Sequence, residues 1–216
     1  GLNRFDGYRF TTFRYAPFDS LSISGNSIEH ILEDRGGRFW VVTDNGINLF
    51  DREKEVFYSL KIIGSGNALV QDPQDNFWQG GSAKGLLRLS LPTTARTLEN
   101  VKIDYINSGD TSGHIFTTPV WDASGRGFTG KFDREAYRLR FDSAQRTYKI
   151  DQNFDDVNNA RFRNFLETTD SASNRFYNRF VRATEGKIWM SAGNELLCWD
   201  ARTSQCPAIT ISGEFL

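Results

Sequence analysis

The residues that could take part in acid–base chemistry are few. The chain has two histidines, His30 and His114, which lie far apart in the sequence. Each lies near a segment that is expected to form a β-strand. A buried or solvated side chain explains a histidine there better than a role in proton transfer does. The sequence has no Gly-Lys-Ser/Thr phosphate loop, no G-x-S-x-G turn and no H-E-x-x-H helix. We therefore expect no catalytic residue and no cofactor.

Two clusters of side-chain oxygens could in principle hold a hard cation. They are Asp155-Asp156 with Asn158-Asn159, and Asp72 with Asp75-Asn76. Neither cluster has the ligand spacing of a Ca²⁺ loop, and turns rich in Asp and Asn account for both. We expect no metal site.

Aromatic and basic side chains could bind a ligand without catalysing a reaction. Rings for stacking on a sugar are Trp121, Phe154 and Tyr177, and guanidinium groups for holding a carboxylate are Arg161, Arg163, Arg175 and Arg179. Ordinary packing and a mixed-charge surface account for these residues equally well. These side chains therefore do not identify which residues bind a ligand.

Cys198 and Cys206 flank a segment that reads as a hairpin turn. Facing positions in a hairpin can bring two Cβ atoms close enough for a disulfide. Two reduced thiols are the equally weighted alternative, and with no histidine nearby the pair is not expected to bind zinc.

The elements that position these residues follow from a motif that recurs four times. An Asp or a small residue opens a turn, and a bulky aromatic follows six residues later. The copies are Asp34 with Gly37 and Trp40, Asp72 with Trp78, Asp122 with Gly125 and Phe128, and Gly186 with Trp189, where Ala183 stands in place of Asp. Asp at the first and Gly at the fourth position favour a type I turn. The recurrence predicts a repeated supersecondary unit.

The segments around each turn predict four antiparallel strands, a unit of about 40 residues that is typical of a propeller blade. We expect an all-β fold over residues 1–216, with about four blades plus a half-blade, as an open part of a larger propeller. The half-blade is expected because Leu2-Asn-Arg-Phe-Asp6 repeats the ending of a third strand. The expected bounds are 1–15 for the half-blade, about 27–62, 66–107, 114–151 and 179–212 for the blades, and 152–178 for a long insertion.

Composition restricts the partners. The 216 residues are 14% aromatic, which favours strands, and their formal net charge is -1. A net charge this close to zero gives no overall electrostatic attraction to nucleic acid or to an anionic membrane surface. No apolar stretch approaches the roughly 18 residues that span a bilayer, so any membrane contact is expected only through segments outside this chain.

The first full unit resembles a known repeat. Ile31-Leu-Glu-Asp-Arg-Gly-Gly-Arg-Phe-Trp-Val-Val-Thr-Asp-Asn-Gly-Ile-Asn-Leu-Phe-Asp51 is similar to the two-component regulator propeller repeat of bacterial sensors, and residues 67–89 and 181–200 are weaker copies. The resemblance implies a periplasmic sensory input region of an inner-membrane protein, with a histidine kinase or diguanylate cyclase output outside this chain. Its motifs are structural, so no ligand contact transfers to these residues.

The resemblance therefore implies that the segment is a non-enzymatic sensor of a two-component system. Its expected partners are an oligosaccharide or other small-molecule signal, and copies or blades of its own kind through self-association. Two alternatives remain: a carbohydrate-active propeller enzyme, either a lyase or a hydrolase, and a pure protein-interaction scaffold.

Overall fold

All regular secondary structure in the described part of the chain is β-strand. The computed structural model describes residues 1–62, 68–82, 84–106, 116, 118–121, 127–130, 136–145, 147–151, 179–182, 187–192, 195–200 and 208–210. For residues 120, 128, 130, 136 and the strand residues from 151 onward it describes the backbone alone. The chain divides into two units, Gly1–Tyr105 and Ile106–Leu216.

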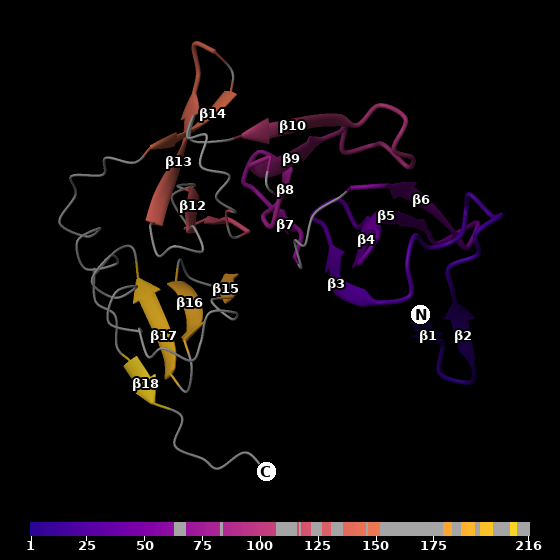
Figure 1. Ribbon diagram of the computed structural model, residues 1–216. Helices are drawn as coiled ribbons and strands as arrows, with labels where there is room; N and C mark the ends of the chain where they lie inside the picture. The colour runs from indigo at the N-terminus through magenta and orange to yellow at the C-terminus, as the bar shows by residue number, and fades with distance from the viewer. Residues whose placement is uncertain are drawn as a thin grey trace. The chain divides into compact units, whose positions relative to one another are not determined.

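The first unit is built from one two-stranded and two four-stranded sheets (Figure 1). The N-terminal hairpin consists of β1 (Leu2–Phe5) and β2 (Phe10–Phe13). The first blade consists of β3 (Ile28–Glu33), β4 (Phe39–Thr43), β5 (Gly46–Asp51) and β6 (Val56–Leu60). The second blade consists of β7 (Val70–Gln71), β8 (Phe77–Gln79), β9 (Leu86–Ser90) and β10 (Lys102–Ile106).

The second unit contains two more four-stranded sheets. The third blade consists of β11 (Val120–Trp121), β12 (Gly127–Gly130), β13 (Ala136–Asp142) and β14 (Thr147–Asp151). The fourth consists of β15 (Arg179–Arg182), β16 (Lys187–Ala192), β17 (Glu195–Asp200) and β18 (Ala208–Thr210). In all four blades the strands lie side by side in chain order, and β11 lies next to β15. Successive small antiparallel sheets of this kind are the blades of a β-propeller.

The turn between β4 and β5 depends on a glycine at the start of β5. Thr43 pairs with Gly46, so the two-residue loop is Asp44-Asn45, and neither of these residues has a positive φ. Gly46 itself has a φ of +156°, and a Cβ there would lie 2.2 Å from the backbone oxygen of Leu60, so both the backbone conformation and the close approach favour glycine.

The core of the first unit lies on both faces of the first blade. On one face Val41, Phe50 and Phe57 pack with Ile23 and with Phe13 of the N-terminal hairpin. The opposite face carries Trp40 and other apolar side chains, which pack against the second blade through Phe77, Leu87 and Leu89. Because both faces are covered, β4 and β5 are buried along almost their whole length, whereas β3 alternates between half-buried and exposed positions.

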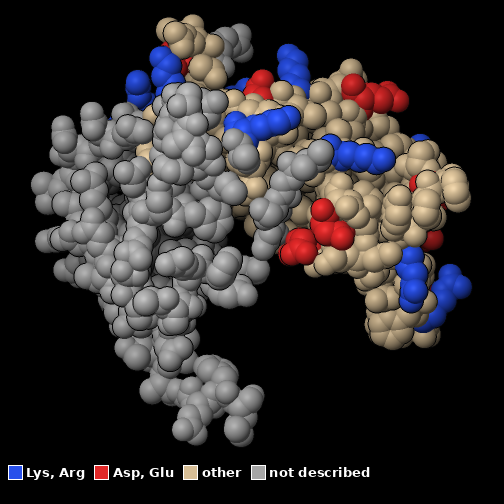
Figure 2. All heavy atoms as spheres, in the orientation of Figure 1, with Lys and Arg blue, Asp and Glu red and all other residues tan. Residues whose placement is uncertain are grey.

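The surface of the described residues is mixed in charge. On the face drawn in Figure 2, basic and acidic side chains are interspersed without a continuous patch of either sign. A search of the described residues for a helix long and apolar enough to cross a membrane finds none.

Candidate functional site

The recurring turn is the most highly organised polar structure in the first unit. In the first blade the carboxylate of Asp34 is buried, and its Oδ1 accepts the backbone N–H groups of Gly36 and Arg38, each at 2.9 Å. Its Oδ2 accepts Nε of Arg38 at 2.6 Å and the indole Nε1 of Trp40 at 2.8 Å. The six-residue offset thus has a direct cause, since it places the indole of Trp40, in β4, within hydrogen-bond distance of the Asp34 carboxylate at the start of the turn.

The second blade repeats this geometry with one exchange. Oδ1 of Asp72 accepts the backbone N–H groups of Gln74 at 2.9 Å and Asn76 at 2.8 Å. Oδ2 accepts the indole Nε1 of Trp78 at 2.8 Å, and the side-chain amide of Asn76, also at 2.8 Å, takes the place of the arginine in the first blade. A neutral donor therefore replaces a charged one while the carboxylate keeps four hydrogen bonds.

The charge on Asp34 is held in place by its donors. Burial by itself would raise the pKa of this carboxyl, but hydrogen bonds from the Trp40 indole and from the Arg38 backbone and side chain, together with the charge of Arg38, outweigh it. The pKa of Asp34 therefore lies below its ordinary value. The Asp34–Arg38 ion pair is almost wholly buried, with side-chain exposures of 0% and 2%.

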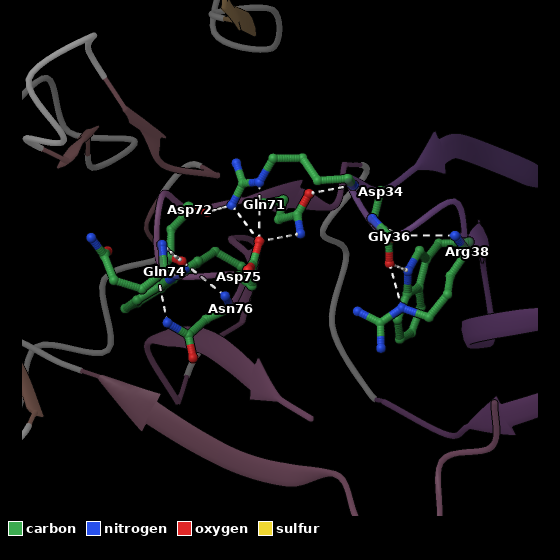
Figure 3. Close-up of polar contacts among 11 residues, drawn as sticks. Asp34, Gly36, Arg38, Gln71, Asp72, Gln74, Asp75 and Asn76 are labelled. Carbon is green, nitrogen blue, oxygen red and sulfur yellow. Dashed lines mark hydrogen bonds and ion pairs between the residues drawn. The ribbon is translucent and has the colours of Figure 1, made fainter. Parts of the chain in front are cut away.

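The two turns are joined to each other (Figure 3). Arg35 donates to the backbone oxygen of Asp72 and to Oδ1 of Asp75, the latter at 2.6 Å from Nη2 and 3.0 Å from Nε. The backbone N–H of Arg35 donates to Oε1 of Gln71 at 3.0 Å, and the amide of Gln71 donates to Asp75 at 2.9 Å. Arg38 adds a bond from Nη1 to the backbone oxygen of Pro92 at 2.8 Å. The first blade is thereby fastened to the second by its own turn.

This arrangement suits mechanical fixing rather than chemistry. The carboxylate oxygens of Asp34 and Asp72 are occupied by N–H donors, so neither is disposed to act as a base or to coordinate a cation. Asp75, a member of one proposed cation cluster, accepts from Arg35 and Gln71. In the ranges that the structure describes, no three His, Cys, Asp or Glu side chains gather as a metal site. His30 is half-buried, and its Nδ1 accepts the backbone N–H of Leu69 at 3.4 Å.

Several residues singled out from the sequence lie outside the described side chains. Asp122, Gly125, Gly186 and Cys206 are outside the described residues, as are His114, Phe154, Tyr177, Arg161, Arg163, Arg175 and the Asp155–Asn159 cluster. Only the backbone is described for Phe128 in β12, Trp189 in β16, Cys198 in β17 and Arg179 in β15. Trp121 is described and is 3% exposed, so it is a core residue and not a surface for stacking on a sugar.

Sequence reasoning did not single out Asn48, which is wholly buried in the first blade. Its Oδ1 accepts the backbone N–H of Ser24 at 2.9 Å and the hydroxyl of Ser59 at 2.6 Å, and its Nδ2 donates to the backbone oxygen of Val41 at 2.9 Å. It thus ties three strands and the loop before β3 together. The signal that could have identified it is the near-repetition of Gly46-Ile-Asn-Leu-Phe-Asp51 at residues 1–6.

Comparison with solved structures finds the same fold in much longer proteins. The extracellular domain of BT4673 from B. thetaiotaomicron, assigned as a hybrid two component system, has a TM-score of 0.63 at 14% identity over 98% of this chain and 28% of that one. The corresponding domain of BT3049 has a TM-score of 0.56 at 16% identity, over 95% of this chain and 24% of that one. PorZ, a surface component of the type-IX secretion system of Porphyromonas gingivalis, has a TM-score of 0.56 at 16% identity, with coverage of 95% and 30%.

Sequence comparison finds a family match over the first two strands of the first blade. No curated protein matches the sequence. Residues 22–45 match the family described as two component regulator propeller, and this range includes the whole Asp34–Trp40 turn. The chain therefore has the β-propeller fold, and within it residues 22–45 match the two component regulator propeller family.

Proposed function

We propose that this chain is an extracytoplasmic sensory segment of a bacterial two-component signal transduction protein. The observation that carries the proposal is the family match over residues 22–45, whose Asp, Gly and Trp form the four-donor turn of the first blade. The extracellular domains of BT4673 and BT3049, both assigned to hybrid two component systems, have the same fold and add support.

The segment itself is proposed to be non-catalytic. Because it spans 28% of the length of the BT4673 domain, the output is proposed to come from elsewhere in the protein, as a histidine kinase or a diguanylate cyclase. The signal is proposed to be an oligosaccharide or another small molecule. It would bind at the irregular connections between strands, because the carboxylates of the described turns are already occupied by donors.

Signalling requires a ligand to bind one arrangement of blades or protomers more tightly than another. Within the contact between the two described turns, the Arg35–Asp75 ion pair could respond to such a change, since its side chains are 46% and 39% exposed and this pair alone separates at little cost. Self-association of protomers through neighbouring blades would carry that change to the output.

Two reporters fused after Leu216 in the full-length protein test the location. Alkaline phosphatase, which is active outside the cytoplasm, is expected to be active, and a green fluorescent protein, which matures in the cytoplasm, is expected to be dark. The opposite pattern would contradict the proposal.

A screen of oligosaccharides tests the sensory role. The full-length protein is expected to change its phosphorylation or cyclase output with a ligand that also raises the melting temperature of this chain. Turnover of an oligosaccharide by the chain alone would make it an enzyme and would refute the non-catalytic assignment.

A further inference from the structure

Two residues in the described part of the chain hold a side chain in the left-handed backbone region. They are Glu55, with a φ of +57°, and Asp75, with a φ of +65°, and every other described residue with a positive φ is a glycine. A side chain is strained in this region because its Cβ crowds the backbone. Such strain persists only where the surrounding structure compensates for it, so both positions need an explanation.

Asp75 stands where the other copies of the turn have glycine. It is the fourth residue of the second turn, and the corresponding residue of the first turn is Gly37, which has a φ of +75°. The sequence has glycine at this position in the remaining copies, Gly125 and Gly186. The first turn closes without a side chain there, because the N–H of Gly37 donates to the backbone oxygen of Asp34 at 2.9 Å. The aspartate is therefore not required by its own turn.

The carboxylate of Asp75 serves instead as an acceptor for the first blade (Figure 3). Its Oδ1 accepts Nη2 of Arg35 at 2.6 Å, Nε of Arg35 at 3.0 Å and the side-chain amide of Gln71 at 2.9 Å. Gln71 in turn accepts the backbone N–H of Arg35 at 3.0 Å. These bonds form a closed ring between the main chain and the side chain of Arg35, so the strained residue is held by the neighbouring blade.

Glu55 has the same relationship to the N-terminal hairpin. It is the last residue of the turn between β5 and β6, and its Oε1 accepts Nη2 of Arg4, a residue of β1, at 2.6 Å. Both strained residues are thus carboxylates that accept an arginine from the preceding sheet in the chain. The recurrence at two successive junctions indicates that the strain and the contact belong together.

The contact and the strain are closely balanced at both junctions. The side chains of Arg4 and Glu55 are 36% and 48% exposed, and those of Arg35 and Asp75 are 46% and 39% exposed. Ion pairs this exposed stabilise a protein only slightly, and the strain of one left-handed residue is of comparable size. A small displacement of the arginine is therefore enough to favour opening of the turn.

We propose that Arg4–Glu55 and Arg35–Asp75 are strained clasps, in which an arginine of one sheet holds a turn of the next sheet in a strained conformation. Withdrawal of the arginine loosens that turn, because the strain is then no longer compensated. The turn of a blade thereby responds to the sheet before it. The use of this response in signalling rests on the proposed sensory function, whereas the clasps themselves do not.

Glycine substitutions with and without each arginine test the clasps. With Arg35 in place, Asp75→Gly removes both the strain and the contact, so the melting temperature is expected to change by less than about 1 °C. In the Arg35→Ala background it removes only the strain, and is expected to raise the melting temperature by about 2 °C or more. Glu55→Gly should behave in the same way with and without Arg4→Ala. A glycine that fails to raise the melting temperature in the arginine-free backgrounds would overturn the proposal.

Amide hydrogen exchange locates the effect in the turn. Arg35→Ala is expected to lower the protection factors of the Gln74 and Asn76 amides by about threefold or more, and added Asp75→Gly is expected to restore them, because an unstrained turn opens less often. Arg4→Ala is the matched control and should leave these two amides unchanged. Protection that Asp75→Gly does not restore would contradict a strained turn.

Further variants separate backbone strain from charge. Asp75→Asn and Glu55→Gln remove the charge but keep a side chain in the left-handed region, so in the arginine-free backgrounds they should raise the melting temperature much less than glycine does. An equal rise would assign the effect to charge and overturn the proposal. Gly37→Asp places the same residue in the same geometry, where a new Cβ meets no atom within 4 Å. It should lower the melting temperature by about 2 °C or more, and no loss would show that the position stores no strain.

These measurements use the chain without a ligand. Failure of the glycine pattern would overturn the clasps and leave the sensory function standing. Failure of the full-length protein to respond to any signal would do the reverse.

Discussion

Asp34 accepts four hydrogen bonds on two carboxylate oxygens while it is shielded from water. A buried carboxylate is tolerated only when such donors replace its hydration. Asp72 meets the same requirement with a neutral amide in place of the guanidinium. The turn therefore depends on the acidic side chain itself, and the aromatic six residues later contributes its indole N–H as well as its apolar surface.

Removal of this carboxylate should be costly. Asp34→Ala leaves the Arg38 guanidinium, which is 2% exposed, without its counter-ion, and is expected to lower the free energy of unfolding by about 3–5 kcal/mol. Urea denaturation measures the loss. Asp6→Ala is the matched control, because Asp6 also accepts backbone N–H groups in a turn but is exposed, and its loss should be much smaller. Similar losses for the two variants would contradict the role of burial.

The lowered pKa of Asp34 predicts how stability depends on pH. A carboxyl whose folded pKa lies below its unfolded value of about 3.9 stabilises the fold above that pH. The stability is lost as the pH falls through the folded pKa, so the free energy of unfolding should fall between about pH 4 and the still lower folded pKa.

Three further aspartates add to the same trend. The pKa of Asp6 is lowered chiefly by the backbone hydrogen bond from Arg9, that of Asp51 by the one from Lys54, and that of Asp142 by the side chain of Lys149. A triple variant, Asp6→Asn, Asp51→Asn and Asp142→Asn, should keep part of the acid-induced loss in urea titrations at several pH values. A flat profile in this variant would exclude Asp34 as a contributor.

At the scale of the elements, the hairpins depend on close approach between strands. Gly46 is the first residue of β5 and lies against the backbone oxygen of Leu60 in β6, which cannot move without breaking the pairing of the two strands. Asn48, two residues on, joins β4, β5 and β6. The outer strands of the first blade are thus positioned by contacts that involve backbone atoms and one buried amide.

Two glycine substitutions compare steric overlap combined with backbone strain to backbone strain alone. Gly46→Ala is expected to cost about 3 kcal/mol or more, because the new Cβ would lie 2.2 Å from a backbone oxygen and the φ of +156° also disfavours a side chain. Gly37→Ala meets no atom within 4 Å, so only its φ of +75° opposes the change, at about 1–2 kcal/mol. Thermal unfolding of both variants gives the order, and an equal or larger loss for Gly37→Ala would show that the overlap at Gly46 relaxes.

At the scale of the whole molecule, each unit of the chain has its own sheets, and in the first unit one blade is held to the next by polar and apolar contacts together. Trp40 and Phe77 pack with ring centroids 4.6 Å apart, and Arg35 crosses from the first turn to the second. The apolar contact supplies most of the stabilisation, because exposed ion pairs contribute little.

Arg35→Ala tests whether the contact from the first blade stabilises the turn of the second blade. The expected loss of stability is only about 0.5–1 kcal/mol, since the pair is nearly half exposed. Amide exchange in residues 72–76 should nevertheless accelerate, because that turn loses its contact with the first blade. Arg52→Ala removes an exposed ion pair to Glu33 within one blade and should leave residues 72–76 unaffected. Acceleration by both variants would indicate a general loosening.

The sequence by itself determined the fold class, because the offset between Asp and aromatic and the short turns are local features that recur with each unit. It also located the turns of the first two blades, whose Asp34, Trp40, Asp72 and Trp78 form one hydrogen-bonded motif. It did not reveal the roles of Arg35, Gln71 and Asn48, because each acts on a partner in another strand or blade, and such pairings follow from packing. Only the tertiary structure decided that Phe50 is buried while its counterpart Phe5 is exposed, since burial depends on whether a neighbouring strand covers the same local sequence.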